Sequence, residues 1–113
     1  MPAIFYRTEG GREPVRDWLK ALDRAGRRGI GEDVKLVDFG WPAGMPVCSP
    51  LGDGRHEVRT DRTANRIARV LFYIDQRRRM VLLHAFVKKY QAAPQAELDR
   101  ARDCKRKHER GSS

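Results

Sequence analysis

Five basic side chains fall on or beside three short β-type segments in the second half of the chain. They are Arg59, Arg66, Arg69, Lys88 and Lys89. Guanidinium and ammonium groups carry a stable positive charge, and a planar guanidinium matches a phosphate or a carboxylate with two hydrogen bonds. Cations gathered on one sheet therefore predict a polyanionic partner, either a nucleic acid or an acidic protein.

The net charge of +9 comes entirely from the second half of the chain. Residues 1–54 hold eight Lys and Arg against eight Asp and Glu, whereas residues 55–113 hold sixteen against seven. A basic surface that only keeps the protein soluble would give the same totals. Charge alone thus predicts affinity for polyanions without indicating a particular reaction.

Three runs rich in Val, Ile, Phe and Tyr must position these cations. They cover residues 56–60, 66–74 and 80–87, with polar, turn-forming clusters between them. Their length and their β-branched and aromatic content predict strands, and the short connections predict a three-stranded antiparallel meander. Because side chains alternate along a strand, Glu57 and Arg59 are expected on one face, while Lys88 and Lys89 are expected on opposite faces.

The first half of the chain predicts one strand and two helices. Residues 3–7 are typical of a short strand, and Pro14 suits the first turn of a helix. Gly26 and Gly29 are expected to interrupt this helix, and a second helix is expected to end near Phe39. Residues 40–54 contain four glycines and three prolines, which predicts a long irregular loop.

The last part of the chain predicts a third helix that starts near Pro94. A basic, polar tail from about residue 105 is expected to fray or to dock only on an acidic partner. The predicted order is β–α–α–β–β–β–α. The sequence therefore predicts one small α+β domain over residues 1–113, with the helices largely on one face of the sheet.

Composition indicates in which compartment the protein is expected to act and whether it is expected to bind a metal or a cofactor. No apolar run approaches the roughly 20 residues that cross a bilayer, and no secretory signal is visible. Cys48 and Cys104 match no metal-binding spacing and are expected to stay reduced in a cytoplasmic protein. We expect neither a metal nor a cofactor.

Residues 56–101 carry a combination of short motifs. These motifs are Glu57-Val-Arg59, the run from Arg69 to Tyr73, the run from Leu82 to Lys89, and Pro94 followed by Glu97. In this combination the chain resembles the RelE/ParE superfamily of bacterial toxins, in particular its phage-derived HigB-like branch. The resemblance implies a small RelE-like fold, a twisted antiparallel sheet with an N-terminal helical hairpin and a C-terminal helix. Many members cleave messenger RNA in the ribosomal decoding site, whereas the ParE branch poisons DNA gyrase.

The resemblance also implies a catalytic set without a metal. The neighbouring 2′-hydroxyl of the RNA would attack the phosphorus, while side chains move protons and stabilise the charge on the phosphate. Arg59, Arg69 and Lys89 match basic positions of the family, and Arg69 would brace the scissile phosphate. Glu57 stands where the best-known members have a lysine. It would act as a base or, as we prefer, form a structural ion pair with Arg59.

Four further residues are expected to contact the substrate. They are Lys88, Tyr90, Arg66 and His56. Tyr90 would stack on a base or donate a proton, although packing between helix and sheet explains it equally well. His84 has the strand parity of Leu82 and Phe86, which predicts a histidine satisfied within the core.

The leading hypothesis is the toxin of a type II toxin–antitoxin pair, acting as a ribosome-associated endoribonuclease. Its partners would be a helix-turn-helix antitoxin of the HigA-like kind, the ribosome and messenger RNA, with no membrane. The alternatives are a non-catalytic toxin that binds gyrase and a phage-derived nucleic-acid-binding regulator. Under the leading hypothesis, Arg69→Ala is expected to abolish growth arrest while leaving the fold intact.

Overall fold

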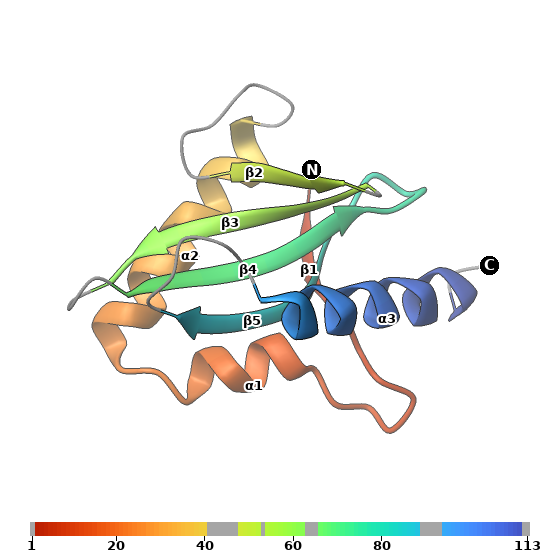
Figure 1. The fold of residues 1–113 in the computed structure, drawn as a ribbon, viewed down its shortest axis with the longest axis horizontal. Helices are drawn as coiled ribbons and strands as arrows, with labels where there is room; N and C mark the ends of the chain where they lie inside the picture. Colours follow the sequence, from red (N-terminus) through yellow and green to blue (C-terminus); the bar gives the residue numbers. More distant parts are fainter. Residues whose placement is uncertain (1, 41–47, 53, 63–65, 89–93, 112–113) are drawn as a thin grey trace.

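A five-stranded sheet forms the centre of the molecule, with the strands in the order β1-β5-β4-β3-β2 (Figure 1). The computed structural model describes residues 2–40, 48–52, 54–62, 66–88 and 94–111. The elements are β1 (Ala3–Phe5), α1 (Pro14–Lys20), α2 (Arg24–Gly40), β2 (Cys48–Gly52), β3 (Arg55–Asp61), β4 (Ile67–Ile74), β5 (Met80–Lys88) and α3 (Gln95–Gly111). The predicted α+β fold class is confirmed.

The predicted meander is confirmed as strands β3, β4 and β5, which pair antiparallel in sequence order. The sheet as a whole is mixed, because β1 pairs in parallel with β5 and Ala3 lies beside Met80. The expected antiparallel pairing is therefore confirmed for β2 to β5 and is wrong for β1. A chain segment with two helices separates β1 from the meander, and such a crossover is what a parallel neighbour requires.

Strand β2 occupies part of the segment that was expected to be an irregular loop. Its residues pair antiparallel with β3, and the register shifts between Pro50 and Gly52. Gly52 has a φ of 86°. Proline is tolerated in an edge strand because it needs no hydrogen bond on the outer side, and glycine permits the left-handed φ. The prediction is thus wrong for residues 48–52, and residues 41–47 lie outside the described part of the chain.

Helices cover both faces of the sheet, so the expectation that they lie largely on one face is wrong. We call the two faces the hairpin face, covered by α1 and α2, and the α3 face (Figure 1). The hairpin-face core includes Val15, Ile30, Val37, Val58, Val70 and Phe72. The α3-face core includes Tyr6, Leu71, Tyr73, Leu83 and Ala101. Apart from Arg69, strand β4 is apolar on both faces because it is covered on both.

Helix α2 begins earlier than the glycines suggested. The Asp23 carboxylate accepts a hydrogen bond of 2.9 Å from the backbone N–H of Gly26, and so supplies a partner that the first turn of the helix lacks. A Cβ at Gly26 would meet the end of the Arg62 side chain and would lie 2.7 Å from Oδ1 of Asp23, the carboxylate that binds this turn. Gly26 therefore allows a close approach at the helix start instead of ending a helix.

Helix α3 continues to Gly111, so residues 105–111 do not form the frayed tail that was expected. The phenol of Tyr73 hydrogen bonds to the His108 ring, and Lys105 Nζ lies 5.5 Å from the centre of the Tyr73 ring. Burial raises the pKa of Tyr73 to about 12. At the other end of α3, Arg55 Nη1 donates a 2.7 Å bond to the carbonyl of Leu98. These contacts hold the basic helix against the sheet.

Helices long and apolar enough to cross a membrane are absent from the described residues.

Candidate functional site

A buried ion pair joins neighbouring strands on the α3 face. Nη1 of Arg69 in β4 lies 2.9 Å from Oε2 and 3.1 Å from Oε1 of Glu57 in β3. Glu57 lies opposite Leu71 in the register, and Leu71 belongs to the α3-face core. Only 1% of Arg69 and 4% of Glu57 is exposed. Both charged groups therefore sit within the sheet at positions that an apolar pair could fill.

Burial of two charges is costly, and their attraction often only balances the loss of hydration. The penalty is several kcal/mol for each ion, and apolar residues of similar size often give equal or greater stability. The pair between Arg69 and Glu57 is therefore poorly explained by stability alone. Such a pair is a candidate for a functional role, because it fixes the position of its charged groups.

Arg59 is the solvent-facing cation of this group. It lies directly opposite Arg69 in the register. Its Nε is 3.8 Å from Oε1 of Glu57, and 36% of its side chain is exposed. Glu57 was expected to pair with Arg59, but its closer partner is Arg69. We call Glu57, Arg59 and Arg69 the ionic cluster.

Strand β5 brings further candidate groups to the same end of the sheet. Phe86 lies opposite Arg69, and Lys88 lies opposite Ile67. Directly opposed residues of antiparallel strands share a face. Register thus places Lys88, which is exposed, on the face that carries the ionic cluster. A cleft of about 380 Å³ follows this part of β5.

His84 in this cleft was missed as a candidate. Its Nε2 lies 3.0 Å from Oε2 of Glu97 in the first turn of α3. The register of β5 shifts opposite Leu71 and Phe72, so Leu82 belongs to the hairpin-face core while Phe86 belongs to the α3-face core. Simple alternation from Leu82 is therefore wrong for His84. The sequence signal that could have found the pair is Glu97 just after Pro94.

The other candidates from the sequence are placed differently. Arg66 is exposed and lies immediately before β4. His56 stacks on Phe72, with ring centres 5.4 Å apart, and Phe72 belongs to the hairpin-face core. His56 therefore lies on the sheet face opposite the ionic cluster. Lys89 and Tyr90 lie outside the described residues.

The burial of His56 predicts how the stability of the protein changes with pH. Burial lowers the pKa of His56 below its ordinary value of 6.5. The unfolded chain then binds this proton more readily than the folded chain, so stability falls as the pH drops through 6.5. We expect His56→Gln to lose less thermal stability than the unaltered protein between about pH 7.5 and about pH 5.5.

Thermal unfolding followed by circular dichroism at both pH values checks this expectation. Burial also lowers the pKa of His108, but that histidine is present in both proteins and cancels in the comparison. Equal losses of Tm in the two proteins would contradict a role for His56.

The arrangement combines groups that hold a phosphate with groups that exchange protons. Arg59 and Lys88 offer positive charge at the surface, while Glu57 and the pair of His84 with Glu97 offer acceptors for a proton. No three His, Cys, Asp or Glu side chains of the described residues form a group that would hold a metal ion. The chemistry that these side chains can supply is acid–base and electrostatic.

The order and pairing of these elements are consistent with a small RelE-like α+β fold. The family model described as phage derived protein Gp49-like matches residues 17–106. The chain therefore belongs to the Gp49-like family of phage-derived proteins, which is RelE-like and toxin-like. The match includes β3, β4 and β5, and so includes every residue of the ionic cluster. A search of the curated proteins gave no match.

Proposed function

We propose that this protein is the toxin of a type II toxin–antitoxin system and acts as an endoribonuclease on messenger RNA at the ribosome. The observation that carries the proposal is the ionic cluster, in which a partly exposed arginine lies beside a carboxylate held by a second, buried arginine. Membership of a toxin-like family supports the same conclusion.

The proposed reaction uses a nucleophile that belongs to the RNA. The 2′-hydroxyl attacks the adjacent phosphorus in line, the bond to the 5′-oxygen breaks, and a cyclic phosphate and a 5′-hydroxyl result. Arg59 and Lys88 stabilise the charge that develops on the phosphate oxygens. Preorganised charges of this kind are often the largest part of catalysis. This reaction does not require a metal ion.

Proton transfer is assigned to groups beside these cations. Glu57 accepts the proton of the 2′-hydroxyl, and Arg69 acts as a positioning residue because its guanidinium fixes both carboxylate oxygens. The pair of His84 with Glu97 is the second group able to carry a proton. Lys89 remains a proposed catalytic group on the basis of the family resemblance, and Tyr90 remains a proposed substrate contact.

The proposed partners follow from the same function. A helix-turn-helix antitoxin of the HigA-like kind would neutralise the toxin by covering its basic surface or by adding bulk that excludes it from the ribosome. The basic second half of the chain supports binding to ribosomal and messenger RNA. Such a toxin acts in the cytoplasm, where it inhibits translation.

Mapping of RNA 5′ ends tests the proposed function. Transcripts are incubated with purified ribosomes, with and without the protein, and we expect new 5′ ends within the translated region only when both are present. A parallel sample with the protein but no ribosomes shows whether cleavage needs the ribosome. Intact transcripts together with arrested DNA replication in cells would contradict the proposal and would favour a gyrase-binding toxin.

A further inference from the structure

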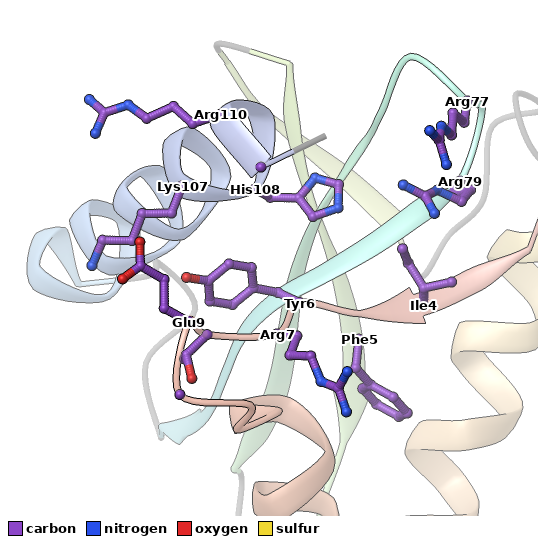
Figure 2. A pocket seen from close by; sticks show the side chains of 13 residues that line it. Ile4, Phe5, Tyr6, Arg7, Glu9, Arg77, Arg79, Lys107, His108 and Arg110 are labelled. Carbon is purple, nitrogen blue, oxygen red and sulfur yellow. The ribbon is translucent and has the colours of Figure 1, made fainter. Parts of the chain in front are cut away.

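A wide basic cleft lies at the opposite end of β4 from the ionic cluster. Three segments line it, namely the residues that leave β1, the hairpin between β4 and β5, and the last turn of α3 (Figure 2). Its volume is about 900 Å³. Arg69 lies near the start of β4, while the hairpin residues Arg77 and Arg79 follow its end, so the two regions are separated by the length of the strand.

Basic side chains dominate the lining of this cleft. They are Arg7, Arg77, Arg79, Lys107 and Arg110, with Glu9 as the acidic member and His108 as a further polar residue. Figure 2 shows Arg77 and Arg79 on one side and Lys107 and Arg110 on the other, with the His108 ring between them. The cations thus come from distant parts of the sequence and line one cleft.

The walls of the cleft are fixed by contacts that leave cationic groups available. Asp75 accepts hydrogen bonds from the backbone N–H groups of Arg77 and Arg79 and an ion pair of 2.7 Å from the Arg79 guanidinium. Burial alone would raise the pKa of Asp75, but these bonds outweigh it and lower that pKa. Asp75 therefore stays ionised and holds the hairpin closed.

Two of the cations have no acidic neighbour in the described part of the chain. Arg7 and Arg77 are exposed, and no carboxylate of residues 2–40, 48–52, 54–62, 66–88 or 94–111 lies within 4.0 Å of either guanidinium. Lys107, in contrast, pairs with Asp103 at 3.2 Å. Arg7 and Arg77 are therefore the cations best able to take up a new anionic partner.

We propose that this cleft is a second RNA-binding site, which holds the phosphate backbone of an RNA strand. The inference rests on the proposed function for the class of ligand, but it concerns a site that is separate from the ionic cluster. Four of the lining side chains are arginines, whose planar guanidinium suits phosphate oxygens. Cations on both walls match a ligand that carries a charge at every nucleotide.

An acidic protein segment fits the cleft less well. Protein partners are usually anchored by apolar side chains that enter a hydrophobic centre. Two aromatic residues line the cleft: Tyr6 is only 5% exposed and packs in the α3-face core, and Phe5 is partly buried against the hairpin-face core. Binding here would therefore be mainly electrostatic, which is typical of contacts with a nucleic-acid backbone.

The test measures binding without cleavage. The probe is a fluorescent 2′-O-methyl oligouridine of about 20 nucleotides, which lacks the attacking hydroxyl and spans a typical single-strand site. We expect Arg7→Ala/Arg77→Ala to weaken binding about tenfold at about 0.1 M salt. Affinity for RNA falls as the salt concentration rises. Loss of two phosphate contacts should make the plot of log affinity against log salt concentration less steep by about 1.4.

Two variants provide the controls. Arg24→Ala/Arg27→Ala removes the same charge from exposed positions of α2, on the hairpin face, and should leave the affinity nearly unchanged. Arg7→Lys/Arg77→Lys keeps the charge and should restore most of the binding. Far-ultraviolet circular dichroism checks that each protein is folded.

Two outcomes would overturn the inference. One is equal loss of affinity in the cleft variant and the α2 variant, which would reduce the effect to net charge. The other is a poly-glutamate peptide that binds as tightly as the oligonucleotide and displaces it, which would assign the cleft to an acidic polypeptide. A different combination is that the unaltered protein cuts no RNA in the end-mapping experiment while the cleft variant still loses binding to the probe. That combination would support the cleft as an RNA-binding site and contradict the proposed function.

Discussion

Replacement of Glu57 with alanine is expected to lower the free energy of unfolding by about 3–5 kcal/mol. The Arg69 guanidinium is 1% exposed and shares two hydrogen bonds with this carboxylate, so the variant would leave a buried charge without its acidic partner. Urea unfolding followed by circular dichroism measures the loss. Glu32→Ala is the matched control, because its partner Arg28 is 79% exposed and such pairs contribute about 1 kcal/mol at most.

A double variant separates the destabilisation caused by breaking the ion pair from the contribution of the intact pair to the free energy of unfolding. Glu57→Leu/Arg69→Met removes both charges and fills similar volume, and we expect a stability close to that of the unaltered protein or above it. A double variant as unstable as Glu57→Ala would show that the site needs its charges for folding, and that the pair is a structural element.

The same contacts change how Arg69 should be tested. From the sequence, Arg69→Ala is expected to leave the fold intact, but its guanidinium is buried and its removal would leave the Glu57 carboxylate without that partner. Loss of growth arrest in that variant would therefore report on stability as well as on chemistry. Arg59 provides a cleaner test because its side chain is already at the surface.

Arg59→Ala is expected to lower the rate of RNA cleavage by about 10²–10³-fold, the usual cost of removing one preorganised charge from a transition state. Its ion pair with Glu57 is long, at 3.8 Å, and partly exposed, so stability should change by about 1 kcal/mol or less. The rate is measured by end-mapping on purified ribosomes, and stability by urea unfolding of the same preparation.

The matched control is Arg62→Ala. Arg62 is also a partly exposed arginine, 3.5 Å from a carboxylate, but that carboxylate belongs to Asp23 at the start of α2, away from the ionic cluster. We expect it to cleave RNA at nearly the normal rate. An Arg59→Ala protein that is folded and fully active would remove Arg59 from the mechanism.

The sequence predicts the meander well because the three strands have strong β-type composition and short connections. It misses β2, because Pro50 and Gly52 weaken every local strand signal and only pairing with β3 makes that segment extended. The side of the sheet that α3 covers is equally hidden, since it depends on Leu98 and Ala101 meeting Leu71 and Leu83. Tertiary contacts decide both features.

The sequence predicts only part of the candidate site, because tertiary contacts decide the rest. Strand alternation places Glu57 and Arg59 on one face, as the structure confirms through their shared ion pair. Alternation does not tell how deeply Arg69 is buried or that it, and not Arg59, is the closer partner of Glu57. The partnership of His84 with Glu97 depends on a register shift in β5 that leaves no local mark in the sequence.

The parallel pairing of β1 with β5 has a consequence for synthesis. Ala3 pairs with Met80, and the backbone N–H of Tyr6 donates a hydrogen bond to the carbonyl of Leu82. This edge of the sheet therefore cannot form until residues much further along the chain have been synthesised. Contacts so distant along the chain form late, because a large loop must close first. A translation product interrupted before β5 would leave β1 without this partner and would lack Lys88, so it would carry neither the complete sheet nor the complete candidate site.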